Sequence, residues 1–411
     1  MDTPSITRLA WCDAELGILD FPKGRIQLRS GFGSGLTRRP GEPEGRVWAV
    51  CDRGPNIKVK EAVDRLGVEA LAPHRARDGA KLMPRLDLGP ALAELQVEGD
   101  TVTRLRALPL STSSGRQISG LPLPEGPHAV QEPVFDLKGS ELGTDPAGAD
   151  TEGLAALADG GFWVADEYGP SLLRVDSGGV VKERLVPMGC DDALAGAGYS
   201  VQPILPSIAG RRQLNRGFEA IALAPDQRRL WLAFQSPLAH PDEEAHRHGR
   251  HVRIWRLDAV SGEVEAQFLY PLDPPHSFRR DTAKGKFGPS DIKVSEIAAV
   301  GPTTLLVLER GSETTKIYRA ESGEGSSISP VHLDIGTRPT IEEASAAGEL
   351  AEPVLDKQLL FTSDDAPEVA ADLEGMVLLS PHDLLLASDN DFGVDGAETS
   401  FWRLTFAEPI V

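Results

Sequence analysis

Short apolar segments alternate with polar turns along this chain, and one arrangement of them recurs. A glutamate, an apolar segment, a turn, a second apolar segment and a polar cluster follow one another at Glu152, Glu219, Glu296 and Glu374. Apolar runs of about four to eight residues between turn residues are typical of β-strands. The best helical candidate, residues 60–71, would be a loop insert. The pattern therefore predicts an all-β fold made of repeated units.

A degenerate copy of the unit lies near the start of the chain, where residues 46–56 read RVWAVCDRGPN. The polar clusters of the copies lie at Asp52, Asp166, Gln235, Glu309 and Asp389, separated by 114, 69, 74 and 80 residues. The first gap is the longest, and residues 95–110 within it resemble a hairpin of a divergent unit. We therefore expect six units.

Radial repetition of four-stranded sheets is the plan of a β-propeller, in which each repeat forms one blade. Hairpins with glycine-containing turns, such as SLLRVD-SGG-VVKERLVP after Asp166, complete each blade to four strands. We expect residues 1–411 to form a single β-propeller domain of six blades, each with four antiparallel strands, around a central acidic channel. Residues 6–11 and 401–406 would share one blade and close the ring.

The charge balance narrows the range of partners. Acidic residues outnumber basic ones by 62 to 42, which gives a formal net charge of −20. Such a field repels nucleic acid and anionic membranes, so neither is an expected partner. It would also repel an anionic small substrate unless a bound cation reversed the local sign. We expect a monomer that acts on a small-molecule ester.

Cysteine usage and the first residues bear on the compartment. Cys12, Cys51 and Cys190 form no C-x-x-C pair, and so sparse a set is typical of a reducing compartment. Residues 1–11 contain no cationic stretch followed by an apolar run, and the sequence has no apolar segment that would span a membrane. The sequence as written predicts a cytoplasmic protein, or a periplasmic or secreted one if an export signal has been removed.

The carboxylates of the repeat are the main candidates for chemistry. A glutamate at the start of an innermost strand lies beside the central channel, and carboxylates at the ends of the second strands would add a tier near one mouth. Crowded carboxylates cannot all stay ionised and unpaired, and Ca²⁺, before other divalent cations, suits oxygen ligands without histidine or cysteine. The predicted metal ligands are Asp52, Glu152, Asp166, Glu219, Glu296, Glu374, Asp389 and Asp391.

The same carboxylates have a structural alternative. Acidic residues at strand ends of propellers can accept hydrogen bonds from neighbouring backbone N–H groups and so fix the blades. Arg53, Arg216 and Arg310 lie beside acidic positions and would neutralise some of them. Alternation along a strand also means that, of Asp52 and Arg53, only one need face the channel.

Five motifs in a fixed order carry a family resemblance. They are DEYGPS (residues 166–171), NRGFE (215–219), QSPL (235–238), SEI with LER (295–297 and 308–310) and DNDFG (389–393). With these motifs, from residue 33 to the C-terminus, the sequence resembles the phytase-like β-propeller family, described as "esterase-like activity of phytase". One departure is Ala220, which follows Glu219 where the family favours glycine.

The resemblance implies kinship with calcium-dependent propeller phytases, which hydrolyse phosphate monoesters over a cluster of Ca²⁺ ions. Calcium would then lie at the acidic mouth, bind phosphate oxygens and activate water. By the same resemblance, Arg53, Arg216 and Arg310 would be phosphate clamps. Glu167 and Glu309 are the carboxylates whose removal we expect to abolish activity.

Three functions remain open from the sequence. The first is a metal-dependent hydrolase of phosphate or related esters, and the second a Ca²⁺-dependent lactonase or carboxylic esterase with a neutral substrate. The third is a non-catalytic binding propeller in which the acidic ring is structural. The sequence contains no G-x-S-x-G nucleophile elbow, no Walker A motif and no dinucleotide fingerprint, so none of these supports a different enzyme class.

Overall fold

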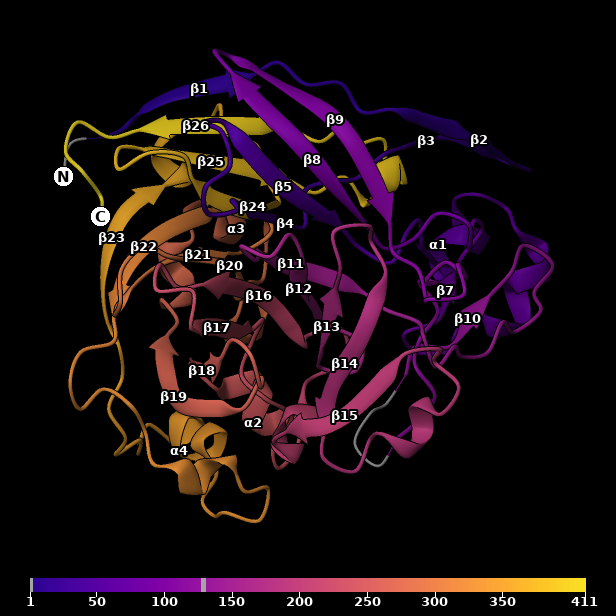
Figure 1. Ribbon diagram of the computed structural model, residues 1–411. Helices are drawn as coiled ribbons and strands as arrows, with labels where there is room; N and C mark the ends of the chain where they lie inside the picture. Colours follow the sequence, from indigo (N-terminus) through magenta and orange to yellow (C-terminus); the bar gives the residue numbers. More distant parts are fainter. Residues whose placement is uncertain (1–2, 127–130) are drawn as a thin grey trace.

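Five antiparallel sheets surround a common axis in the computed structural model, which describes residues 3–126 and 131–411 (Figure 1). Their innermost strands contact one another in the cyclic order β4, β11, β16, β20, β24 and back to β4. This is the arrangement of a β-propeller, and it confirms the predicted fold class.

Each blade runs outward from its innermost strand. The first blade contains β4 (Gly35–Thr37), β5 (Arg46–Cys51), β8 (Ala91–Glu98) and β9 (Thr101–Pro109). The second contains β11 (Thr151–Ala156), β12 (Phe162–Asp166), β13 (Ser171–Val175), β14 (Val181–Pro187) and a parallel fifth strand, β15 (Ser200–Leu205). The third contains β16 (Phe218–Leu223), β17 (Arg229–Phe234), β18 (His251–Asp258) and β19 (Val264–Pro271).

The fourth blade contains β20 (Lys293–Ala299), β21 (Thr304–Arg310), β22 (Thr315–Glu321) and β23 (Asp356–Thr362). The fifth contains β24 (Leu373–Leu378), β25 (Asp383–Ser388), β26 (Phe401–Thr405) and, outermost, β1 (Ser5–Leu9). Because β1 pairs antiparallel with β26, with Ser5 opposite Thr405 and Leu9 opposite Phe401, the two ends of the chain close the ring as predicted (Figure 1).

The expectation of six blades is wrong, because five such sheets make up the ring in the part of the chain that is described. Residues 95–110 form the outer strands β8 and β9 of the first blade rather than a blade of their own. The rest of the long gap is an insertion with little regular structure. It contains β6 (Ile57–Lys58), α1 (Val59–Asp64), η1 (Glu69–His74), β7 (Lys81–Leu82) and β10 (Val134–Phe135), and it includes the predicted helical stretch.

The insertion packs against a hairpin from the start of the chain. The hairpin strands are β2 (Glu15–Phe21) and β3 (Gly24–Arg29). Phe21, Ile26 and Leu28 of the hairpin share one buried apolar cluster with Leu82 and Phe135 of the insertion. We call the hairpin and this insertion the cap, which lies beside the second and first blades (Figure 1).

Apolar side chains on the faces of adjacent blades form the core. The largest cluster joins the second, third and fourth blades and includes the buried Trp163, Trp231 and Trp255. The remaining helices are α2 (Glu243–His248), α3 (Arg279–Lys284), α4 (Ile341–Ala347), η2 (Asp192–Leu194), η3 (Ser207–Arg211), η4 (Pro275–Ser277), η5 (Pro289–Asp291), η6 (Pro330–Leu333), η7 (Ser363–Asp365) and η8 (Asp391–Gly393). Within the described residues, no helix is both long and apolar enough to cross a bilayer.

Candidate functional site

A polar cavity of about 360 Å³ opens where the inner strands begin and the second strands end. Antiparallel pairing brings these two kinds of strand end to the same face of the propeller. The carboxylates that line it are Asp52, Glu61, Asp150, Glu152, Glu167, Glu219, Asp372, Glu374, Asp389, Asp391 and Asp395, and the cations are Arg53, Lys58, Lys81, Lys293 and Arg310. Of these, Glu61, Lys58 and Lys81 belong to the cap.

A β-bulge at the start of an inner strand aims the repeat glutamates into this cavity. In β11, Thr151 faces Asp166 and Gly153 faces Ala165, so Glu152 is the extra residue of the bulge. The register shifts at the same place in β16 and β24, where Glu219 and Glu374 are the extra residues. A bulge re-aims one side chain without ending the strand.

The fourth blade carries the same bulge with a different residue. In β20 the register skips Ser295, so Glu296 occupies the position that Gly153 and Gly375 occupy in other blades. Glu296 is buried and does not line the cavity; it accepts hydrogen bonds from Leu36 N and Ile297 N, both at 3.0 Å. The structure therefore places Glu296 as a link between blades, which corresponds to the structural alternative.

Six cavity carboxylates gather in two groups of three. Asp52, Asp389 and Asp391 each place an oxygen within 4.8 Å of the others, and we call them the first triad. Asp150, Glu152 and Glu167 do the same and form the second triad. The first triad joins the first and fifth blades, whereas the second belongs to the second blade alone. Sequence reasoning missed Asp150, although it lies two residues before Glu152.

Burial and mutual repulsion dominate the electrostatics of both triads. Burial raises the pKa of Asp52 well above its usual value, and Asp150 and Asp391 raise it further. Burial also raises the pKa of Glu152 and of Glu167, with Asp150 and Glu219 adding to both. Without a cation the charged forms of these groups are therefore less favourable than those of ordinary carboxyl groups. A divalent cation would replace protons on these groups and offset the repulsion.

The donor set fits a hard cation. Glu167 is 2% exposed, and its Oε1 is buried without a hydrogen-bond partner. Gln235 donates to Glu219 at 2.6 Å, but its Oε1 is likewise buried and unpartnered. Unpaired buried oxygens are costly unless a ligand satisfies them. Both triads offer only oxygen ligands, as Ca²⁺ prefers.

Two predicted site residues lie outside the cavity lining. Asp166 is buried in the second blade, where it pairs with Arg184 and accepts from Ser171 Oγ at 2.8 Å and Asp150 N at 2.8 Å. Glu309 is buried in the fourth blade, where Lys357 Nζ at 2.7 Å and Tyr270 OH at 2.8 Å saturate one of its oxygens. Neither carboxylate is available to a ligand in the cavity, so the roles expected for them do not fit this geometry.

The three predicted arginines differ in what they contact. Arg53 pairs with Glu132 at 2.7 Å and Asp150 at 3.0 Å. Arg310 pairs with Glu374 and with Asp372. Arg216 does not line the cavity, and its Nη1 is buried without a partner. Two of the three are thus already neutralised by carboxylates.

Lys293, which the sequence did not single out, lines the cavity at the start of β20. It forms no ion pair within 4.0 Å anywhere in residues 3–126 or 131–411. The neighbouring Arg310 and its burial lower the pKa of Lys293, while Glu374 and Glu219 oppose that shift. An unpaired ammonium amid so many carboxylates leaves room for an anionic group of a ligand.

Backbone strain is concentrated around the cavity. Among the described non-glycine residues with positive φ, three line the cavity: Asn215 at 56°, Asp372 at 50° and Asp391 at 46°. Phe392, which follows Asp391, has φ of 54°. Left-handed backbone is least costly for Asn and Asp, yet it persists only where the surroundings enforce it, typically at functional sites.

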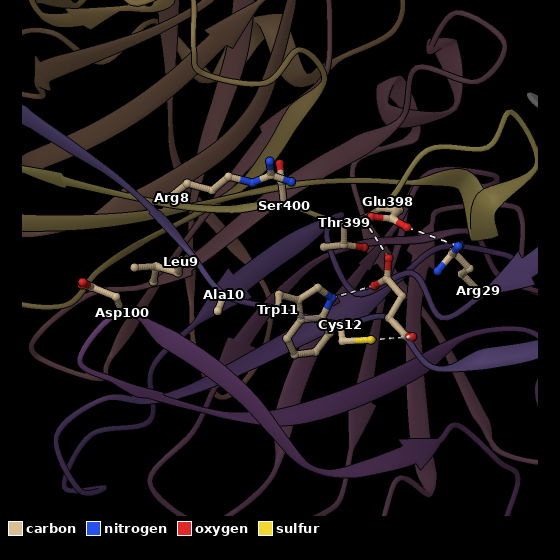
Figure 2. Close-up of a pocket in the computed structure, with 11 residues that line it drawn as sticks. Arg8, Leu9, Ala10, Trp11, Cys12, Arg29, Asp100, Glu398, Thr399 and Ser400 are labelled. Carbon is tan, nitrogen blue, oxygen red and sulfur yellow. Dashed lines mark hydrogen bonds and ion pairs between the residues drawn. The ribbon is translucent and has the colours of Figure 1, made fainter.

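A second cavity of about 380 Å³ lies beside the N-terminal strand (Figure 2). Its polar groups mostly satisfy one another. Asp13 accepts from Trp11 Nε1 at 2.6 Å and from Thr399 N at 2.8 Å, and Arg29 pairs with Glu398 at 3.2 Å. It contains none of the predicted site residues and no carboxylate triad among its described lining residues.

A known family model covers most of the chain. The model of the family Phytase-like, "esterase-like activity of phytase", matches residues 29–392. A protein of Arthroderma benhamiae, described as an uncharacterized secreted protein, is 25% identical over 327 residues. That match covers 70% of this chain, and the chain spans 62% of the relative's length.

Solved structures with a similar arrangement have little sequence in common with the chain. The PQQ-bound aldose sugar dehydrogenase of Streptomyces coelicolor has a TM-score of 0.33 at 10% identity, covering 98% of this chain and 99% of its own. Virginiamycin B lyase of Staphylococcus aureus has a TM-score of 0.32 at 12% identity, covering 95% and 98%. Similarity at this level says nothing about ligand or reaction.

Proposed function

The chain belongs to the phytase-like family, and we propose that it is a divalent-cation-dependent hydrolase that cleaves phosphate monoesters in the acidic cavity. The observation that carries the proposal is the pair of carboxylate triads, with the buried, unpartnered Glu167 Oε1 facing no protein donor. Family membership supports a hydrolase-like propeller; the cation and the substrate class are our inference.

Asp52, Asp389 and Asp391 would hold one cation, and Asp150, Glu152 and Glu167 another, with Ca²⁺ the best match to the all-oxygen donors. When bound, such ions polarise phosphoryl oxygens and lower the pKa of bound water. The carboxylates would hold and orient the ions. We assign no cation to Glu219 or to Glu374. Gln235 already donates to Glu219, and Arg310 already pairs with Glu374.

The anionic end of the substrate needs cations that carboxylates have not already neutralised. Lys293 has no carboxylate partner within ion-pair distance, and Nη1 of Arg216 is a buried donor without a hydrogen-bond partner. Lys293 would bind the phosphate directly, while Arg216 strengthens the positive potential behind it. Arg53 and Arg310 would hold the carboxylate walls in place instead of clamping the phosphate.

One observation favours a neutral carboxylic ester or lactone as the substrate instead. The cavity lining contains eleven carboxylates and five cationic side chains, so its field repels anions until cations bind. A neutral ester would need the cations only to polarise its carbonyl. Substrate preference separates the two functions.

A calcium-dependent reaction suits an extracytoplasmic setting, where weak calcium sites are filled. The Arthroderma benhamiae relative is described as secreted. We therefore propose that this protein also acts outside the cytoplasm, in place of the cytoplasmic location expected from the sequence as written.

The test is a side-by-side assay on p-nitrophenyl phosphate and p-nitrophenyl acetate, with Ca²⁺ and with EDTA. We expect calcium-dependent release from the phosphate, loss of it in Glu167→Gln, and wild-type rates in Glu141→Gln, which removes only an exposed pair with Arg77. Release from the acetate alone would move the function to neutral esters. If neither substrate is hydrolysed and calcium does not change the melting temperature, the protein would be a non-catalytic binding propeller.

A further inference from the structure

The loop that supplies Asp389 and Asp391 depends on distant parts of the chain for its shape. Asp391 and Phe392 are consecutive residues with positive φ, and the backbone turns on itself where Gly393 N donates to Asn390 O at 2.7 Å. Such a turn persists only if its surroundings hold it. The side chain between the two aspartates, Asn390, is 1% exposed and does not line the cavity.

Asp13 is the side chain that holds Asn390. Asn390 Nδ2 donates to Asp13 Oδ2 at 3.1 Å and to Ser30 O at 3.0 Å. The same Asp13 oxygen accepts from Thr399 N at 2.8 Å, and its other oxygen accepts from Trp11 Nε1 at 2.6 Å (Figure 2). Asp13 is 5% exposed, so these bonds form away from water.

Gly31 and Gly33, which follow the β2–β3 hairpin, pack closely against the loop. A Cβ at Gly31 would lie 2.7 Å from Asn390 Oδ1, and one at Gly33 would lie 2.8 Å from Asp389 Cα. The backbone at Gly31 and Gly33 therefore packs against one side of the loop, and Asp13 accepts a hydrogen bond from Asn390 on another side. Both contacts come from residues more than 350 positions away in sequence.

We propose that Asp13 is a positioning residue for the first triad, acting through Asn390 to hold the carboxylates of Asp389 and Asp391 at ligand spacing. This inference rests on the proposed function, because it assumes that the first triad binds a cation. Groups that orient metal ligands from behind typically change metal affinity by about 10–100-fold when removed. The second triad has no contact with Asp13 in the described residues and provides an internal reference.

The experiment is calorimetric titration of calcium into metal-free protein for the wild type, Asp13→Asn, Asn390→Ala and the double variant. Asp100→Asn is the matched control, because Asp100 lines the same cavity as Asp13 but is exposed and pairs only with the half-buried Arg403. Melting temperatures with EDTA and with calcium accompany each titration. A merely structural Asp13 would lower both temperatures equally and leave the calcium-induced difference unchanged.

We expect Asp13→Asn and Asn390→Ala each to weaken one class of calcium site about 10–100-fold, with the double variant no weaker than either single one. Wild-type affinity in Asp13→Asn, or losses that add in the double variant, would overturn the proposal. If Asp13→Asn does not fold, Asn390→Ala with unchanged affinity overturns it equally. Absence of calcium binding in the wild type would instead refute the proposed function itself, and the inference with it.

Discussion

Asp166 and Glu167 are neighbours at the end of one strand, yet they belong to two different regions of the molecule. Asp166 faces the blade interior, where Arg184, Ser171 and a backbone N–H saturate it. Glu167 faces the channel mouth, where one of its oxygens has no partner at all. In the blade interior an ion pair joins two strands, whereas at the channel mouth a carboxylate oxygen of Glu167 has no partner.

Burial alone does not identify a functional carboxylate. Both residues are almost fully buried, as is Glu309, whose partners Tyr270 and Lys357 come from the third and the fourth blade. What distinguishes Glu167 is a buried oxygen without a partner, with strained backbone nearby; a raised pKa does not, because burial also raises the pKa of Glu309.

Breaking the interior pair should have the largest effect on stability. Arg184→Leu leaves the buried charge of Asp166 without its cation, and loss of one partner of such a pair costs about 3–5 kcal/mol. We expect the free energy of unfolding to fall by that amount in urea titrations, with calcium affinity of the folded protein unchanged. A loss below about 1 kcal/mol would mean that the interior pair is no more important than a surface one.

The stability of the calcium-free protein should depend on pH in the direction set by the channel mouth. Burial raises the pKa of Glu374 to about 7 from an ordinary 4.5, although Arg310 and Lys293 oppose the shift. At Glu374 the folded state therefore binds more protons than the unfolded state between these values, so the contribution of this group to stability is full below about pH 4.5 and is lost as pH rises through 7. The difference amounts to about 3 kcal/mol.

Thermal unfolding in EDTA from pH 4.5 to 8 measures this dependence, and calcium should reduce the part of it that comes from the triad carboxylates, because the cation replaces their protons. The prediction is contradicted if the calcium-free protein becomes more stable over that interval.

Lys293→Met should separate anionic from neutral substrates. Charge-assisted hydrogen bonds contribute about 1.5–3 kcal/mol, so KM for p-nitrophenyl phosphate should rise about tenfold or more while KM for the acetate stays constant. Lys284→Met, which removes only an exposed pair with Glu313, is the control. Equal changes on both substrates would mean that Lys293 does not contact the anionic group.

Glu167→Gln should act in opposite directions with and without calcium. The neutral amide removes a carboxyl group whose charged form is disfavoured by burial and by Glu219 and Asp150, so we expect the calcium-free variant to be more stable than the wild type. The stabilisation by added calcium should fall, because the second triad loses a ligand. Melting curves in EDTA and in calcium give both quantities. A variant that is less stable in EDTA would show Glu167 to be structural.

We expect the smallest effect on stability from a substitution at an exposed ion pair. Glu141→Gln breaks an exposed pair with Arg77, and such pairs contribute about 0–1 kcal/mol. We expect no measurable change in calcium affinity and at most a few tenths of a kcal/mol in unfolding free energy. A larger change would mean that the cap, which contains Arg77's segment, is coupled to the cavity.

Some elements could be predicted because they depend on local pattern. The strand repeats, the closing pair of the first and last strands, and the gathering of Glu152, Glu219 and Glu374 at one mouth all follow from spacing and alternation. The error in blade number arose at the first gap, since a hairpin and an insertion leave the same spacing as an additional blade. No periodicity distinguishes the two.

Glu296 shows where spacing stops being informative. The sequence aligns it with the other repeat glutamates, but the bulge of its strand falls on Ser295 and turns Glu296 toward Leu36. A shift of one residue sends a side chain to the other face of a strand, and the position of a bulge depends on how neighbouring strands pair. No short segment of the sequence specifies that strand pairing.

By itself, then, the sequence determined the kind of fold, the ring closure and the acidity of the channel mouth, because each follows from residue type and order. Only the tertiary structure decided which carboxylates stay unpaired. Asp166 and Glu309 receive their cations from other strands, whereas Glu167 meets none, and Asp13 contacts a loop 377 residues away. Pairing is a property of positions in space, and the folded chain brings those positions together.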